Sequence, residues 1–302
     1  MQHFKLHFFL VVISFLIVVH PVFSQKDSLN KKRLSLVLTT ETALYGSSLV
    51  GLNELWYKNY PRSSFHFFND NTEWLQMDKV GHVVTSYYVG RVGIGLLKWS
   101  GVSSKKAIWY GGTLGLLYQS TIEILDGYST EWGFSFADFA ANVAGSLLVI
   151  GQELAWGEQR VVLKYSFMQS EFANYRPNVL GKNFKENVLK DYNGQTYWLS
   201  INPSSFMRKE IAFPKWLNIA VGYGADGMIG GKMNTPTFDK SGNQKYFERY
   251  RQFYLSFDVD LTRIKTKSKF LNTFFNTVGF LKIPAPALEF NKKGVNGNLL
   301  GF

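Results

Sequence analysis

Cysteine is absent from this sequence of 302 residues. Without thiols the chain can form no disulfide, can use no cysteine nucleophile and can hold no cysteine-ligated metal. We also expect no lipid anchor through an N-terminal cysteine. Histidine is scarce as well, because beyond residue 24 only His66 and His82 remain. This scarcity argues against a zinc site built from several histidines.

Acidic residues are in short supply in one half of the chain only. Residues 1–159 carry 12 Lys and Arg against 12 Asp and Glu, whereas residues 160–302 carry 21 against 10, which accounts for the whole net charge of +11. A basic half can face nucleic acid or anionic lipid. Here the basic residues are scattered rather than gathered in a motif, so a solvated basic surface is the simplest interpretation.

The N-terminus has the pattern of an export signal. Lys5 precedes a run from Phe8 to Val19 that is almost entirely apolar, and a short segment then ends at Ser24. This order is typical of a secretory signal peptide over residues 1–24, with cleavage after Ser24, and the alternative is an uncleaved anchor helix. We therefore expect an exported protein, in the periplasm or at the outer membrane of a Gram-negative bacterium, with no nucleic-acid partner.

Long hydrophobic runs are also missing. The apolar segments 80–97, 107–122 and 134–150 contain 16 to 18 residues, whereas a helix that spans a bilayer needs about 20. They suit marginal spans, re-entrant segments or the buried helices of a compact bundle. Aromatic residues make up 17% of the chain and are favoured both in strands and at membrane interfaces, so we expect a membrane-associated protein with membrane lipids or envelope proteins as partners.

Hydrophobic periodicity predicts an α+β protein in two parts. Residues 34–156 form a mainly α N-terminal bundle of four helices, at 34–57, 76–99, 104–125 and 135–156. Residues 161–302 form a smaller, basic, β-containing region. Strand-like alternation occurs at 196–201, 217–223 and 252–261, a short helix is expected at 268–278, and prolines make 283–290 an extended or edge segment.

Polar residues gather at the edges of the apolar helices between residues 78 and 146. Short loops make neighbouring helices antiparallel, so the start of the second helix, the end of the third and the start of the fourth meet at one end of the bundle. The spacing within each helix places its members on one face. The set is Asp78, Lys79, His82, Gln119, Glu123, Asp126, Ser135, Asp138, Asn142 and Gly145.

Three uses of this cluster stay open. Carboxylates with one imidazole can hold a divalent metal. His82 can act as a general base or acid with Asp78, Glu123, Asp126 and Asp138 as catalytic partners. The acids at helix starts can also simply stabilise those helices, with Ser135 as N-cap. That last interpretation leaves Glu123 and Asp126 unexplained, since they lie at the C-terminal end of a helix.

The order of these motifs resembles a known family. Asp78-Lys-x-x-His82, Glu123-x-x-Asp126 and Ser135-x-x-Asp138-x-x-x-Asn142-x-x-Gly145 are similar to the YfiM-like family of predicted periplasmic lipoproteins, whose core is a domain of unknown function. A weaker similarity links them to VanZ-like membrane proteins. The resemblance covers about a quarter of the chain and implies a location in the cell envelope, with no established reaction.

The sequence therefore favours a structural or accessory envelope protein with a polar ligand-binding cluster. The alternative is an envelope hydrolase, acting on a lipid or cell-wall intermediate and using His82 as general base or metal ligand. Whether the chain is an enzyme stays open at this stage.

Overall fold

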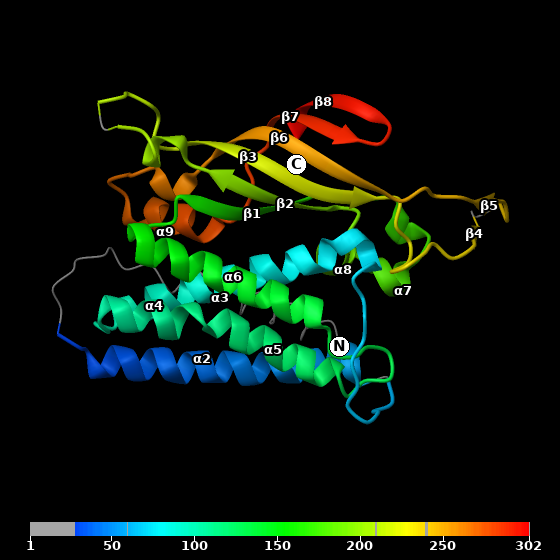
Figure 1. Ribbon diagram of the computed structural model, residues 1–302, viewed down its shortest axis with the longest axis horizontal. Coiled ribbons are helices and arrows are strands. Elements are labelled where there is room, and N and C mark those ends of the chain that lie inside the picture. The colour runs from blue at the N-terminus through cyan, green and yellow to red at the C-terminus, as the bar shows by residue number, and fades with distance from the viewer. Residues whose placement is uncertain (1–27, 59, 209, 239–240, 302) are drawn as a thin grey trace. The chain divides into compact units, whose positions relative to one another are not determined.

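A computed structural model describes residues 28–58, 60–208, 210–238 and 241–301. The predicted signal peptide lies outside these residues. The chain divides into two compact units (Figure 1). We call Met1–Asp70 with His82–Gln159 the helical unit, and Asn71–Gly81 with Arg160–Phe302 the sheet unit. Helices gather in the first half and a sheet in the second, so the chain is an α+β protein, as the sequence predicts.

Most of the helical unit consists of α-helices joined by short loops. Asn30 accepts a hydrogen bond from the backbone N–H of Arg33 and so caps the first of them. A π-helical turn follows that helix at Asn53–Tyr57. The α-helices are α2 (Lys31–Leu52), α3 (Met77–Trp99, whose first residues belong to the sheet unit), α4 (Ser104–Gly112), α5 (Leu114–Asp126) and α6 (Phe136–Trp156).

One predicted helix, 104–125, is divided in two. The α4 helix ends at Gly112 and α5 begins at Leu114. Thr113 lies between them, and its hydroxyl donates to the carbonyl of Trp109, a side-chain bond that bends helices. The preceding glycines also have low helix propensity. The arrangement as a four-helix bundle stays a prediction, with its third helix broken at this position.

Close packing in the helical unit depends on small residues. The helix α6 packs against both α4 and α5, and a core cluster joins Val37 of α2 to Leu96 of α3 and Ala107 of α4. A Cβ added to Gly145 of α6 would lie 2.2 Å from the carbonyl oxygen of Val83 in α3. Only glycine allows these two backbones to approach so closely.

No helix in the described part of the chain combines the length and the hydropathy needed to cross a membrane. The three apolar segments noted in the sequence lie mostly within α3, the α4–α5 pair and α6.

The sheet unit is built on one antiparallel sheet of six strands in the order β1-β2-β3-β6-β7-β8. A separate hairpin of β4 and β5 lies between β3 and β6 in the sequence. The strands are β1 (Val161–Phe167), β2 (Gln195–Ile201), β3 (Leu217–Asp226), β4 (Thr237–Phe238), β5 (Gln244–Lys245), β6 (Tyr250–Val259), β7 (Ala285–Asn291) and β8 (Gly294–Gly301). The helices of this unit are α7 (Pro177–Leu180), α8 (Phe184–Lys190) and α9 (Lys269–Val278), with a 3-10 turn at Glu73–Gln76.

Three predicted strands and the predicted short helix coincide with β2, β3, β6 and α9. The strands β1 and β8 were not predicted. Lys164 stands in the middle of β1 and is completely buried, where it forms an ion pair with Asp258 at 2.7 Å. Because lysine normally lies at a solvent-exposed position, the sequence of β1 does not show the pattern of a buried strand. The strand β8 contains three glycines, which are rare in strands.

Candidate functional site

His82 is the centre of the polar cluster in the helical unit. It lies on α3, and 15% of its side chain is exposed. Its Nδ1 is 3.0 Å from Oδ1 of Asn142 on α6. Its Nε2 is 3.8 Å from Oε1 of Glu123 on α5 and 4.0 Å from Oδ1 of Asp138 on α6. Side chains from three helices therefore meet at His82.

The hydrogen-bond partner of Nδ1 decides which ring nitrogen keeps a free lone pair. An amide oxygen can only accept, so a hydrogen bond to Asn142 requires the tautomer in which Nδ1 carries the hydrogen. The Nε2 of the neutral ring then presents a lone pair toward the carboxylates of Glu123 and Asp138. The amide nitrogen of Gln119 lies 3.2 Å from the same Nδ1; it can only donate, so it bonds the ring only in the other tautomer, in which Nδ1 accepts.

Asn142 is completely buried, and its side-chain oxygen has two neighbours at hydrogen-bond distance. Besides His82, the hydroxyl of Ser86 donates to Oδ1 over 3.2 Å. Its amide nitrogen has no hydrogen-bond partner among the described residues. An unsatisfied buried donor costs about 1–3 kcal/mol, so this orientation of Asn142 is held against a penalty. Gly145, one helical turn further along α6, permits the close approach to α3 that brings Asn142 to His82.

Glu123 is an almost fully buried acid with a strongly perturbed pKa. Burial raises its pKa to about 8; His82 acts against the rise, while the negative charges of Asp138 and Asp126 add to it. Its Oε2 accepts a hydrogen bond from the backbone N–H of Ser135 at 3.2 Å. Glu123 thus holds the start of α6 from a different helix. That contact supplies a structural reason for an acid at the C-terminal end of α5.

Ser135 caps α6, as its place in the sequence suggests. Its hydroxyl accepts from the backbone N–H of Asp138 at 3.1 Å and donates to Oδ1 of Asp70 at 2.7 Å. Asp70 is buried, and its part in the cluster was not predicted. Nothing in its local sequence marks it, because it lies in an aromatic loop far from the helical repeats.

Asp126 and Asp78 have partners of their own. Asp126 accepts a hydrogen bond of 2.6 Å from the hydroxyl of Tyr57, another residue that sequence patterns did not identify. Asp78 and Lys79 lie in the first turn of α3, within the segment that belongs to the sheet unit. There Asp78 accepts from the hydroxyl of Tyr192 at 2.8 Å and from Lys79 at 3.3 Å.

This arrangement can support two kinds of chemistry. An imidazole nitrogen and two carboxylates can surround a cation, which would also relieve the repulsion between Glu123 and Asp138. A neutral imidazole beside a protonated carboxyl can instead exchange protons with a substrate. The residues that serve both are His82, Glu123 and Asp138, and Asn142 orients the ring.

Comparison with known proteins gives one match. Residues 66–150 match the model of a family described as predicted periplasmic lipoprotein (DUF2279). No curated protein and no solved structure matches the chain. The match includes His82, Glu123, Asp138 and Asn142, and it ends before residues 160–302 of the sheet unit.

The matched family confirms the resemblance to predicted periplasmic lipoproteins and the exported, periplasmic localisation that the sequence predicts. It lends no support to the similarity with VanZ-like membrane proteins, which stays a prediction. Over residues 66–150 the chain is therefore similar to the predicted periplasmic lipoproteins of DUF2279, a domain of unknown function.

Proposed function

We propose that this protein is a non-enzymatic accessory protein of the cell envelope whose His82 cluster binds a divalent cation within a helical bundle. The proposal includes the outer membrane as the membrane that the protein contacts. One observation carries it: Nε2 of His82 faces carboxylate oxygens of Glu123 and Asp138 at 3.8 and 4.0 Å, while its Nδ1 is held by Asn142.

Each of the two distances from His82, taken by itself, allows that pair of atoms to share an ion. Two ligand atoms that each lie about 2.1 Å from one metal can be at most about 4.2 Å apart, and both distances from His82 fall below that limit. In metal sites the second nitrogen of a ligating histidine usually donates to a carbonyl or carboxylate, which fixes the ring and its tautomer. Asn142 supplies such an acceptor.

The donor set indicates the class of ion. Mg²⁺ and Ca²⁺ prefer oxygen ligands alone, whereas an imidazole with carboxylates suits Mn²⁺ or Zn²⁺. Cation binding would also keep Glu123 ionised at neutral pH, where burial otherwise favours its protonated form.

Metal content and calorimetry test this proposal. The full chain is exported, purified and analysed by mass spectrometry for bound metals, and the metal-free protein is then titrated with MnCl₂ and ZnCl₂. We expect about one ion per chain, lost in His82→Ala and strongly weakened in Glu123→Gln. The matched control is His66→Ala, since His66 is the other histidine of the helical unit beyond the signal. Absence of binding, or equal loss in both histidine variants, would contradict the proposal.

A second candidate is an envelope hydrolase, favoured by the raised pKa of Glu123. A carboxyl that keeps its proton at neutral pH can donate it to a leaving group, while His82 accepts one from water. Release of phosphate from a lipid diphosphate, or of fatty acid from phospholipid vesicles, would reveal such activity. A catalytic role requires that His82→Ala abolish turnover and leave the thermal unfolding midpoint unchanged. No turnover on either substrate would leave the accessory function in place.

A further inference from the structure

One face of the sheet in the sheet unit is apolar and exposed to solvent. Side chains alternate between the two faces of a strand, and strand pairing shows which ones share a face. Leu199, Val221, Leu255 and Leu288 form one row across β2, β3, β6 and β7. All four are exposed to solvent. In an antiparallel sheet with one solvated face, that face is normally polar.

The neighbouring rows continue this surface. Ile219 pairs with Phe257, and Phe253 pairs with Phe290. The exposed fraction of all eight side chains lies between 38% and 57%. We call these eight residues the apolar face. All eight are pure hydrocarbons, and the row of Phe253 and Phe290 continues in Tyr223, whose hydroxyl donates to the carbonyl of Leu75.

The opposite side of the same strands is buried and mixes polar side chains with the core cluster of Trp198, Ala220 and Tyr254. Ser200, Ala220, Ser256 and Ala287 form the row that alternates with the leucine row. The adjacent pair Asn218 and Asp258 is completely buried, and Ser200 donates to Asp258 at 2.6 Å. The buried side therefore holds a hydrogen-bonded network beside this cluster, while the eight side chains of the apolar face stay exposed. Such a surface is stable only where something apolar covers it.

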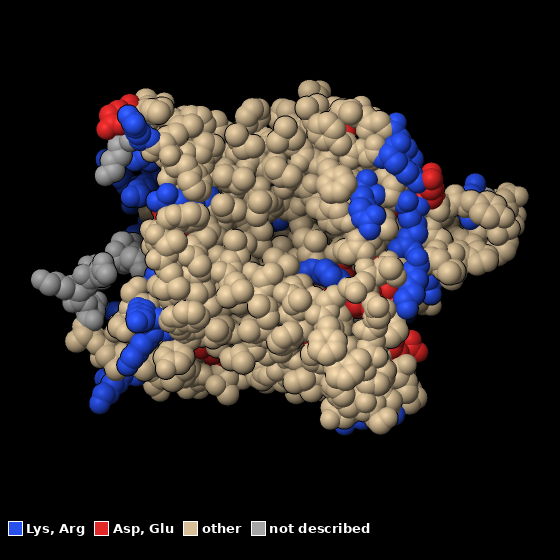
Figure 2. Space-filling view, viewed as in Figure 1, with Lys and Arg blue, Asp and Glu red and all other residues tan. Residues whose placement is uncertain are grey.

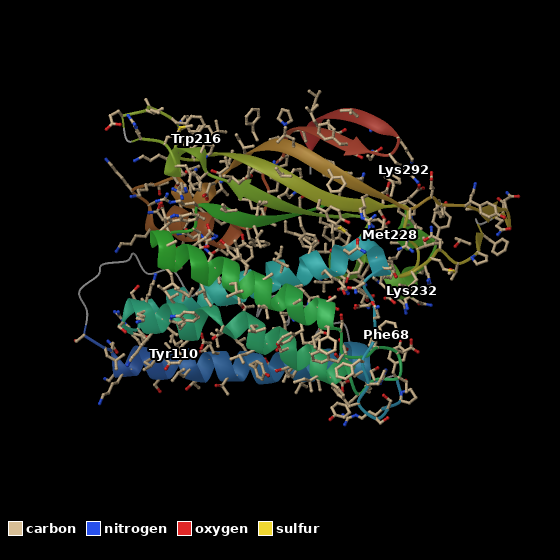
Figure 3. The ribbon with its side chains drawn as sticks, in the orientation of Figure 1. Phe68, Tyr110, Trp216, Met228, Lys232 and Lys292 are labelled. Atoms are coloured by element: carbon tan, nitrogen blue, oxygen red, sulfur yellow. The ribbon has the colours of Figure 1, made fainter. Side chains whose placement is uncertain are left out.

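A basic hollow adjoins one end of the apolar face. It has a volume of about 460 Å³ and is lined by Arg249, Tyr250, Arg251, Phe253, Phe290, Asn291 and Lys292. Phe253 and Phe290 belong to both the hollow and the apolar face. Figure 3 labels Lys292 at the end of the sheet opposite to Trp216, and Figure 2 shows Lys and Arg side chains gathered at the end where Lys292 lies.

The lining of this hollow carries more positive than negative charge, and the carboxylates near it, Glu248 at Lys292 and Glu73 at Arg249, belong to residues outside the lining. The lining itself holds three cations and no carboxylate. The Nε and Nη1 atoms of Arg249 are buried with no hydrogen-bond partner among the described residues. Burial and the nearby charge of Arg251 lower the pKa of Arg249. An anion in the hollow would satisfy these donors and relieve the repulsion.

We propose that the sheet unit docks on a membrane, with an anionic lipid head group in the basic hollow and acyl chains against the apolar face. The two features are continuous through Phe253 and Phe290, and together they match the two parts of one lipid molecule. Arginine forks bind phosphate oxygens in pairs, and basic residues beside a membrane surface each contribute about 1 kcal/mol of attraction to anionic lipid.

A lipid suits this surface better than a protein. Protein interfaces have a polar rim and about one hydrogen bond per 100–200 Å², whereas the apolar face supplies none from its side chains. A second copy of the chain would also bring its own basic hollow, since a two-fold interface uses the same patch on both subunits. Charge therefore favours an anionic surface as the occupant.

Flotation with vesicles tests the proposal. The full exported chain is mixed with vesicles of phosphatidylcholine alone or of phosphatidylcholine with phosphatidylglycerol, and both are separated on a density gradient. We expect the protein to float with the anionic vesicles. Leu255→Thr/Phe257→Thr should lower the partition coefficient by about tenfold or more, because each large side chain loses its transfer from water. Threonine keeps the strand propensity.

Two further variants complete the design. Arg251→Gln/Lys292→Gln should remove the preference for anionic vesicles and the salt dependence of binding. The control, Phe238→Thr/Tyr246→Thr, changes two exposed aromatic residues in or next to the β4–β5 hairpin and should float as the parent does. The proposal is overturned if the parent chain does not float, if the Leu255/Phe257 variant floats equally, or if sedimentation reveals a dimer that this variant dissociates.

Discussion

The pH dependence of stability offers a direct test of how Glu123 is buried. We consider Glu123→Gln in metal-free buffer, since a bound cation would itself stabilise the carboxylate. Glutamine has the same shape, carries no charge and keeps an oxygen that can accept from the backbone N–H of Ser135. The variant therefore removes the titration of residue 123 and preserves its contact with the start of α6.

The magnitude follows from the shift of the pKa. Burial raises the pKa of Glu123 from 4.5 to about 8 in the folded protein. Between these values the native state binds more protons than the unfolded state. The free energy of unfolding therefore falls as pH rises, by up to about 1.4 kcal/mol per pH unit. Over the whole interval the loss is at most about 5 kcal/mol, and it is complete above pH 8.

Urea unfolding at a series of pH values measures this loss. The parent chain should become less stable between pH 5 and about pH 8, and Glu123→Gln should lose most of that decline. The stability of the variant should therefore rise relative to that of the parent as the solution becomes more alkaline.

A second, partly buried acid provides the comparison. Burial raises the pKa of Glu41 on α2 to about 7, so Glu41→Gln should remove only the part of the decline that ends near pH 7. The part between pH 7 and pH 8 belongs to Glu123. If the free energy of unfolding changes equally with pH in Glu123→Gln and in the parent over that upper range, the raised pKa of Glu123 is refuted.

Three further predictions concern packing and polar contacts. Gly145→Ala places a Cβ against the carbonyl of Val83 and should cost about 1–3 kcal/mol by chemical denaturation; Gly151→Ala on the same helix meets nothing within 4 Å and should gain about 0.5–1 kcal/mol. Asn142→Ala should weaken cation binding by about 10- to 100-fold in calorimetry, since the histidine loses its orienting acceptor. Asp258→Asn leaves Lys164 as an uncompensated buried charge and should cost about 3–5 kcal/mol in the same unfolding assay.

Local signals in the sequence explain which elements could be predicted. Ser135 with Asp138 three residues later marks the start of α6, and the structure has that cap. Alternation from Gln252 onward marks β6. The strand β1 escaped prediction, because it depends on contacts with residues distant in the sequence, whereas the break at Thr113 has a local cause in the bond from its hydroxyl to the carbonyl of Trp109. The charge of Lys164 is compatible with burial only when Asp258 lies beside it.

The candidate site likewise contains features that the sequence predicts and features that it does not. The helical spacing of Glu123, Asp138 and Asn142 indicates which faces they share, and short loops indicate which helix ends meet. Spacing cannot supply the partners from irregular segments. Tyr57 at Asp126 and Asp70 at Ser135 come from residues 69 and 65 positions away, beyond the reach of any periodic pattern.

The sequence by itself determined the α+β composition, the resemblance of residues 66–150 to predicted periplasmic lipoproteins and the residue types of the polar cluster, because each is written in local order or composition. Only the tertiary structure decided that Glu123 has a structural partner in Ser135. It likewise decided which face of the sheet is apolar and exposed. Alternation along a strand shows that two faces differ, but burial of one or the other depends on what packs against it, and that is settled by residues far apart in the chain.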